Sequence, residues 1–245
     1  LPKAPYRYQE MLGVIWRENP SCYVEDGEQA VLMAALMETD NAGRPLIDAW
    51  IKRSGLSADA WLEKLFEATV IPFYHLLCRY GVALIAHGQN VTLVMKDYVP
   101  QRILLKDFQG DMRLVDEDFP QAQSLPEQVK AVTARLSADY IIHDLQTGNF
   151  VTVLRFISRL TLQSGVSETR FYQILAGVLH RYMAAHPELA ERFATFDLFK
   201  PQIIRVILNP VKLTFSEHDG GSRMLPNYVT DLDNPLFLAS RESAQ

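Results

Sequence analysis

The chain has 245 residues, of which 48% are hydrophobic, and its formal net charge is −5. This length and composition suit one large domain or two small ones with buried cores. The negative balance argues against a general nucleic-acid binder, and the two cysteines form neither a disulfide framework nor a C-x-x-C metal motif. No run comes near the roughly 20 apolar residues that a membrane-spanning helix needs. We therefore expect a protein of the reducing cytoplasm, with neither membrane nor nucleic acid as a partner.

The first half of the chain changes from helical to strand-like patterning. Residues Gln29–Met37 and Leu46–Lys52 are predicted to form two helices. A longer, largely buried helix is predicted between an N-cap at Ser57 and a terminal Gly81, with a bend or break near Pro72. Short runs rich in Val, Ile and Leu then predict four strands of one small antiparallel sheet, at residues 82–86, 91–95, 102–106 and 112–115.

The second half returns to helix. Ser124, Pro126 and Glu127 indicate a capping box with proline just inside a helix start. Further helices are predicted at residues 150–162, 167–185 and 187–193, and the tail, punctuated by Pro, Gly and Asn, is predicted to be mostly loop. The predicted fold class is α+β, mainly helical with one small antiparallel sheet, and a sub-boundary is expected near residues 120–125.

Polar residues follow two of the predicted strands at the point where each strand ends. His87, Gln89 and Asn90 come after the first strand, and Asp107 comes after the third. Polar groups that converge at strand ends can share one cleft, in which a carboxylate suits Mg²⁺ and His and Asn suit phosphate oxygens. The alternative is that these are ordinary hairpin ends, because turns favour Asn, Asp and Gly on their own account.

Several stretches of the chain resemble the NRPS-independent siderophore synthetases. They are "YGVALIAHGQNVTL", "PQRILLKDFQGDMRL", "SADYIIHDLQTGNFVTVLRFIS", "PQIIRVILNPVKL" and "DGGSRMLPNY". The resemblance implies that residues 1–245 are the C-terminal part of such an enzyme, with palm-like and thumb-like subdomains and without the N-terminal domain. This part of the family is also described as similar to ferric reductases of the FhuF type. Their terminal cysteine cluster is absent from this sequence, so we do not infer iron–sulfur chemistry.

The resemblance also implies roles for individual residues. His87, Gln89 and Asn90 would contact ATP, and Asp107 would hold Mg²⁺. Ile85 stands where many members of the family have Glu, which leaves a second carboxylate ligand in doubt. We expect Asp111 to be solvated. Five cations are weaker candidates for binding anionic groups and could equally be solvated surface charges: Arg17, Arg102, Lys106, Arg205 and Lys212.

The implied reaction is an ATP- and Mg²⁺-dependent ligation in siderophore biosynthesis. A citrate-type carboxylate attacks the α-phosphate of ATP, and the amine of a hydroxylated lysine derivative, N6-acetyl-N6-hydroxylysine, then attacks the acyl group. The family also implies a homodimer. Two alternatives stay open. One is a small-molecule kinase of the aminoglycoside phosphotransferase type, although Asn90 follows His87 by three residues with no Asp between them. The other is that this chain by itself is an inactive ATP-binding and folding module.

Overall fold

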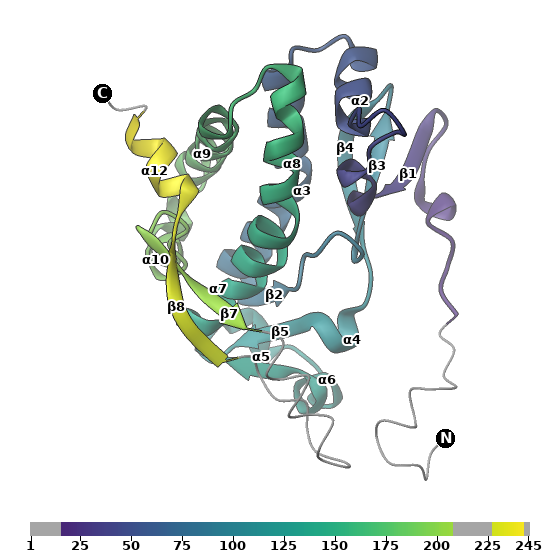
Figure 1. Ribbon diagram of the computed structural model, residues 1–245. Coiled ribbons are helices and arrows are strands. Elements are labelled where there is room, and N and C mark those ends of the chain that lie inside the picture. The colour runs from purple at the N-terminus through teal and green to yellow at the C-terminus, as the bar shows by residue number, and fades with distance from the viewer. Residues whose placement is uncertain (1–15, 208–226, 243–245) are drawn as a thin grey trace, which may run out of the picture.

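The structure is a computed structural model that describes residues 16–207 and 227–242 (Figure 1). Its first elements are η1 (Pro20–Tyr23), β1 (Glu28–Leu32), η2 (Met33–Met37), α2 (Leu46–Ser54), α3 (Ala58–Tyr80), β2 (Val82–Leu84), β3 (Val91–Lys96), β4 (Val99–Leu105), α4 (Phe108–Asp111), β5 (Met112–Val115), α5 (Pro120–Gln123), α6 (Glu127–Val132) and β6 (Ala134–Leu136). The remaining elements are α7 (Ala138–Leu145), η3 (Gln146–Leu154), α8 (Arg155–Leu160), η4 (Thr161–Ser164), α9 (Glu168–Ala185), η5 (Pro187–Leu189), α10 (Ala190–Thr195), β7 (Gln202–Ile207), β8 (Asn227–Asp233) and α12 (Pro235–Glu242).

The helix α3 is long and central to the packing, and it begins and ends where the sequence predicts. The Ser57 hydroxyl accepts a hydrogen bond from the Ala60 amide at 3.2 Å, and Gly81 closes the helix in the left-handed conformation at φ +64°. The helix continues through Pro72 without a break, although proline cannot donate a backbone hydrogen bond there. Its apolar side chains, including the fully buried Trp61 and Phe66, pack into the main core.

The predicted strands form, but they belong to different sheets. The strands β1, β3 and β4 make one antiparallel sheet, in the order β1-β3-β4, and β2, β5 and β6 make a second, in which β5 and β6 run parallel. The pair β7-β8 makes a third, antiparallel sheet. The α+β class is confirmed, whereas the described residues form three small sheets in place of the single sheet that the sequence predicts.

Three local predictions are wrong. The helix predicted at Gln29–Met37 is instead the strand β1 followed by the 3-10 turn η2, because residues 28–32 pair with β3. The capping box does not form: the Ser124 hydroxyl donates to the Gln121 carbonyl at 2.8 Å, and Pro126 occupies the N-cap of α6. The described parts of the tail, which was predicted to be mostly loop, form β7, β8 and α12, whereas residues 208–226, which include "NPVKL" and "HDGG", lie outside the described residues. The helices predicted at residues 46–52, 150–162, 167–185 and 187–193 are confirmed.

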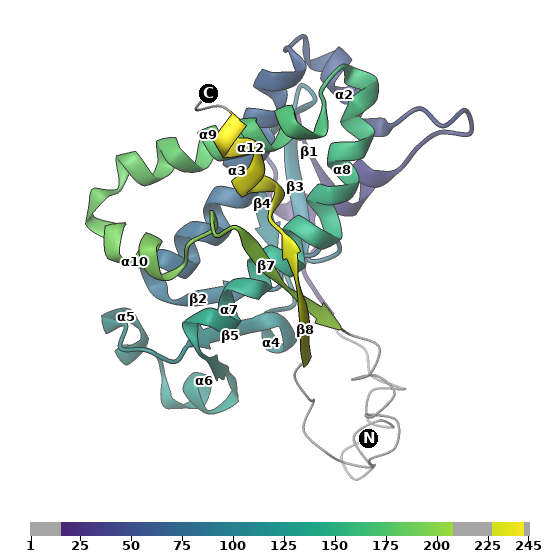
Figure 2. The ribbon, with the colours of Figure 1, turned by 60° about the vertical axis from the view of Figure 1, so that its left-hand side comes forward.

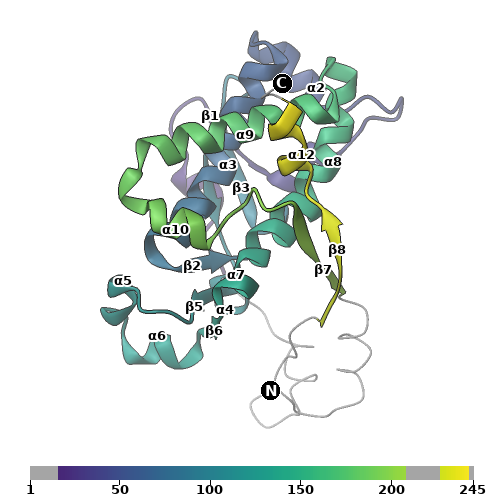
Figure 3. The same ribbon diagram turned by 90° about the vertical axis from the view of Figure 1, so that its left-hand side faces the viewer.

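The elements pack around a shared apolar core. The helix α3 lies against β4 on one side and against α9 on another, and α12 packs on α9. Figures 2 and 3 show the β7-β8 ribbon running beside the column formed by α7 and α8, and β7 contacts η3 within this column. In the described part of the chain, no helix is both long enough and apolar enough to cross a membrane.

Candidate functional site

Residues 85–90 form the loop between β2 and β3, and neighbouring backbone holds this loop at its first residue, Ile85, and in its middle, at Gly88. The Ile85 amide donates to the Asp111 carbonyl at 2.9 Å, which continues the β2-β5 pairing beyond the strand. The Gly88 carbonyl accepts from the Ala34 amide of η2 at 3.1 Å. A Cβ on Gly88 would lie 3.1–3.2 Å from Ala34 atoms, so a larger residue there would require the loop or η2 to shift by a few tenths of an ångström.

Three of the polar residues in this region converge. The Asn90 amide Nδ2 donates to Asp111 Oδ2 at 2.5 Å, and the same oxygen lies 3.8 Å from His87 Nε2. The Asn90 backbone amide also donates to the His87 carbonyl at 2.9 Å, which closes the turn. His87 and Asp111 keep 33% and 20% of their side chains exposed, whereas Asn90 is only 6% exposed. The cluster therefore presents an imidazole and a carboxylate to solvent, with an amide fixed behind them.

Asp107 lies at the other end of the short helix α4. It has φ +66°, a left-handed conformation that Asp tolerates better than most residues, and its carboxylate forms an ion pair with Arg17. This sharp turn after β4 returns the chain so that Asp111 reaches Asn90. Asp111 is therefore not the solvated residue that we expected. Whether Asp107 or Asp111 binds a metal stays a prediction.

The predicted cations are spread over the molecule. Arg17 contacts Asp107, and Lys106, which immediately precedes Asp107, donates its backbone amide to the Asn90 carbonyl at 3.3 Å. These two lie beside the cluster. Arg205 is exposed on β7, and Lys212 lies outside the described residues.

Arg102 is engaged elsewhere, in the sheet β1-β3-β4. Its guanidinium pairs with Glu28 of β1, with 2.8 Å between Nη2 and Oε2, and also donates to the Tyr23 carbonyl. The hydrogen bond from Arg102 lowers the pKa of Glu28 to about 2. Arg102 therefore joins β1 to β4 in this structure, and its predicted role in anion binding would require the ion pair to open. Gln89, the third predicted ATP contact, has an exposed side chain.

A buried ion pair that the sequence analysis missed lies next to this cluster. Arg113, two residues after Asp111, places Nη1 2.8 Å from Asp144 Oδ1, and the two side chains are only 13% and 8% exposed. Burial raises the pKa of Asp144 to about 6, against the opposing effect of Arg113 and with a further contribution from the charge of Asp111. The second oxygen, Asp144 Oδ2, is buried without a hydrogen-bond partner among the described residues.

The π-helix η3 fixes the loop from the opposite side. Asn149, fully buried, donates from Nδ2 to the Ala86 carbonyl at 3.1 Å, directly before His87. A Cβ on Gly148 would lie 3.1 Å from the Ala86 nitrogen and 3.3 Å from Ile85 Cγ2. π-Helical turns are rare and often occur at functional sites. Nothing in the stretch "QTGNF" predicted a π-helix, so the role of Asn149 could not be recognised from the sequence.

The donor groups fit Mg²⁺ only in combination with a ligand. Asp107 and Asp111 supply hard carboxylate oxygens at the two ends of α4, and Mg²⁺ in proteins commonly takes one or two carboxylates and completes its shell with phosphate and water. Within residues 16–207 and 227–242, no group of three or more His, Cys, Asp or Glu side chains could hold a metal by itself. Phosphate oxygens would therefore be required.

Comparisons with known proteins support the family resemblance that the sequence motifs indicate. The model of the family described as "Ferric iron reductase FhuF-like transporter" matches residues 59–222. An aerobactin synthase from Escherichia coli is 67% identical over 242 residues, which cover 99% of this chain and 42% of that protein. An aerobactin synthase from Vibrio mimicus is 59% identical, over 98% of this chain and 40% of that protein.

A solved structure supports the same relationship. The aerobactin synthetase IucC from a hypervirulent pathotype of Klebsiella pneumoniae matches with a TM-score of 0.85 and 64% sequence identity, covering 96% of this chain and 41% of that one. The chain thus spans about two fifths of the length of the relatives that it matches. On the family match, the shared motifs and this structural agreement, the chain belongs to the FhuF-like family and, within it, groups with the siderophore synthetases.

Proposed function

We propose that the protein acts in an ATP- and Mg²⁺-dependent ligase of siderophore biosynthesis, of the aerobactin synthase kind. The reaction would join a citrate-type carboxylate to the amine of N6-acetyl-N6-hydroxylysine. The names and identities of the relatives support a siderophore ligase. We also propose that the protein is cytoplasmic. We further propose that it forms a homodimer, and sedimentation equilibrium would test this oligomeric state.

The observation that carries the proposal is the convergence at loop 85–90. Asp111 Oδ2 lies 2.5 Å from the Asn90 amide nitrogen and 3.8 Å from His87 Nε2, so a carboxylate and an imidazole stand side by side at the solvent boundary. Asp107 follows β4 nearby in the chain, and its charge is balanced by Arg17. A carboxylate next to hydrogen-bond donors suits a metal-bound polyphosphate, because the metal offsets the repulsion between the two anions.

In the proposed reaction, the protein's own groups position the substrates and neutralise charge. His87 and Gln89 would donate to phosphate oxygens, and Asp107 and Asp111 would hold the bound Mg²⁺. The metal would supply electrostatic stabilisation of the phosphates. The carboxylate of the acid bonds to the α-phosphorus and pyrophosphate leaves. The amine then bonds to the acyl carbon, AMP leaves, and the amine loses a proton.

A chimaera offers a direct test of this function. In the Escherichia coli aerobactin synthase, the segment that aligns with this chain is replaced by the chain itself, and pyrophosphate and AMP are measured with citrate-type acid and N6-acetyl-N6-hydroxylysine. We expect release of both products, dependent on Mg²⁺. The parent enzyme is the positive control. A correctly folded chimaera that releases no pyrophosphate above background would contradict the proposal, and ADP as the product would indicate a kinase.

A further inference from the structure

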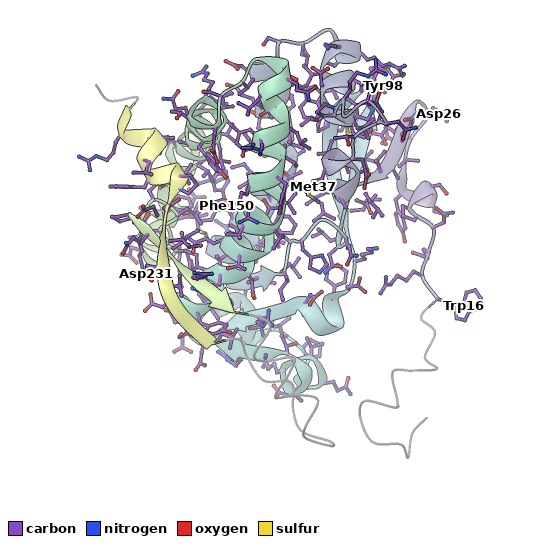
Figure 4. The ribbon with its side chains drawn as sticks, in the orientation of Figure 1. Trp16, Asp26, Met37, Tyr98, Phe150 and Asp231 are labelled. Atoms are coloured by element: carbon purple, nitrogen blue, oxygen red, sulfur yellow. The ribbon has the colours of Figure 1, made fainter. Side chains whose placement is uncertain are left out.

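A small cavity lies at the turn between β3 and β4, at the opposite end of β3 from loop 85–90. It has a volume of about 130 Å³ and is lined by residues of β1, of the β3-β4 turn and of α2. Figure 4 labels Tyr98 of this turn beside α2, at the other end of the sheet from α4. We propose that this cavity binds the end of an alkylammonium cation, at a site separate from the ligase substrates. The inference does not depend on the proposed ligase function.

The turn consists of two residues whose backbone conformation disfavours their side chains. Asp97 and Tyr98 have φ +50° and +65°. Two-residue hairpin turns with φ above zero at both positions favour Asn followed by Gly. A bulky residue with such a φ is an outlier, and outliers of this kind cluster where a side chain binds a ligand. In this turn both side chains line the cavity.

Two neighbouring side chains hold Tyr98 in this conformation. Trp61 Nε1 donates to the Tyr98 carbonyl at 2.8 Å, and Arg53 Nη1 donates to the Tyr98 hydroxyl at 3.3 Å. The Arg53 guanidinium also lies over the ring, 5.3 Å from its centre, so this ring already accepts one cation. Arg53 itself does not line the cavity. The ring is therefore fixed in place and still forms part of the cavity wall.

The lining has the composition of a cation site. Trp50 and Tyr98 supply aromatic rings, and Asp97 is the only charged side chain among the lining residues that the structure describes. The Asp97 carboxylate is exposed and forms no ion pair or hydrogen bond with another residue of the described ranges. Ammonium groups favour aromatic faces and carboxylates, and Gln29 adds an amide oxygen that can accept a hydrogen bond.

The size and position of the cavity limit what it can bind. Sites for whole small molecules begin near about 300 Å³, so a cavity of 130 Å³ admits one end of a ligand and excludes a nucleotide. Val31 and Met95 lie on one face of β1 and β3 and suit the methylene groups next to the ammonium. The six residues of β3 span about 20 Å, which separates this cavity from a reactant held at loop 85–90.

Nuclear magnetic resonance of the 245-residue chain tests the site. The indole N–H signal of Trp50, assigned with Trp50→Phe, is followed while butylamine or butanol is added near neutral pH. We expect a saturable shift with butylamine. Butanol has the same length without the charge, so it should bind at least about tenfold more weakly. Nα-acetyl-lysine methylamide carries the same ammonium group on a peptide unit. Tighter binding of this probe than of butylamine would identify a lysine side chain as the ligand, and the reverse order would identify a free amine.

Asp97→Asn tests the carboxylate. Asparagine also tolerates the left-handed conformation, so the turn should survive while butylamine binding weakens about tenfold. Asp26→Asn is the matched control, because Asp26 is an exposed carboxylate at the same end of the sheet that does not line the cavity. At about 0.15 M salt, which screens distant charges, it should bind butylamine like the unchanged chain.

Tyr98→Gly separates a role in binding from a role in stability. Glycine adopts a positive φ without strain, so the urea midpoint of this variant should not fall, whereas butylamine binding should weaken at least about tenfold. A lower midpoint would show that the tyrosine is retained for packing and would contradict the inference. The inference is also overturned if butylamine gives no saturable shift, if butanol binds as tightly, or if Asp97→Asn and Tyr98→Gly both bind butylamine like the unchanged chain.

A second readout checks that the cavity is separate from the substrates. In the chimaera, Asp97→Asn should leave the KM for the acceptor amine unchanged. A raised acceptor KM would overturn this separation and place the cavity in the substrate site. Pyrophosphate release absent from the unchanged chimaera would contradict the ligase function alone, because the resonance titration does not depend on catalysis.

Discussion

Two groups of polar residues surround the loop 85–90, and they differ in what they contact. The accessible group, His87, Asp107 and Asp111, keeps 33%, 31% and 20% of its side chains exposed. The buried group, Arg113, Asp144 and Asn149, has exposures of 13%, 8% and 0%, and its members bond to each other or to backbone. Both groups carry ionic or amide side chains, and both are close to the same backbone.

The difference in exposure between the two groups indicates that they have different roles. Buried charges are retained only where they are paired, and Arg113 and Asp144 pair with each other. Exposed carboxylates can exchange protein partners for a ligand at low cost. We therefore propose that the accessible group binds the ligand and that the buried group supports the loop, and the substitutions below test this division.

Removal of Arg113 should have the largest effect on stability. Arg113→Met leaves the buried Asp144 carboxylate without its partner, which should lower the free energy of unfolding by about 3–5 kcal/mol at pH 7.5. Urea denaturation monitored by circular dichroism measures this loss. A change below 1 kcal/mol, on the scale of exposed pairs, would show that the pair does not act as a buried one.

The pH dependence of the same variant provides a check with a defined sign. The pKa of Asp144 is raised from 3.8 to about 6, so the folded state holds this proton more tightly than the unfolded state does. Asp144 therefore makes the unmutated chain lose stability as pH rises from about 4 to 6. The loss caused by Arg113→Met should be smaller at pH 5, where Asp144 is mostly neutral. Adding Asp144→Asn should recover part of the loss at pH 7.5 and remove this pH dependence.

Asp107→Asn should have the largest effect on chemistry. Asparagine also tolerates the left-handed conformation at φ +66°, so the turn should survive while the charge is lost. We expect pyrophosphate release by the chimaera to fall about 10²-fold or more, the scale for loss of one transition-state electrostatic contact. The unfolding free energy of the chain should stay nearly unchanged.

Asp111 and Asp118 provide the comparison for this prediction. Asp111→Asn should also lower activity, by about tenfold, because the lost charge faces both His87 and Asn90. Asp118→Asn is the control for a solvated carboxylate, because Asp118 is exposed on the connection after β5. If Asp111→Asn abolishes pyrophosphate release while Asp107→Asn preserves it, Asp107 is removed from the two proposed metal ligands and Asp111 alone remains.

Some of these features could be predicted from the sequence because their signals are local. The cap at Ser57 and the left-handed Gly81 fix both ends of α3, and the Val- and Ile-rich runs fix β3 and β4. The positions of His87 and Asp107 after strands could be predicted for the same reason. Each of these assignments depends on neighbours within a few residues of the chain.

Features that depend on distant partners could not be predicted in this way. Ala30 pairs with Val94, and this pairing makes a strand from a segment that reads as helix. Asp111 reaches Asn90 only because Asp107 turns the chain, and Asn149 meets Ala86 across 63 positions of sequence. The roles of the predicted site residues stay predictions, and they depend on the substitutions described here.

Asn149→Ala should weaken the support of the loop without removing any accessible group. It deletes the hydrogen bond to the buried Ala86 carbonyl, which should cost about 1–2 kcal/mol of stability. The KM for ATP in the chimaera should rise, because the backbone before His87 loses its anchor. Gln163→Ala is the matched control: this amide also donates to a backbone carbonyl, that of Gly43 at 3.2 Å, but on the exposed surface. We expect that variant to lie within about 0.5 kcal/mol of the unchanged chain.

Gln89→Ala should have the smallest effect on stability and an effect on ligand binding alone. The Gln89 side chain is exposed and, within the described chain, has no hydrogen bond that its loss would break, so the unfolding free energy should change by less than about 0.5 kcal/mol. If Gln89 donates to a phosphate oxygen, the KM for ATP should rise by about three- to tenfold, the worth of one partly solvated hydrogen bond. Asn149→Ala changes stability and the KM for ATP together, whereas Gln89→Ala should change only the KM. An unchanged KM would remove Gln89 from the proposed ATP contacts and leave His87 as the exposed donor of the loop.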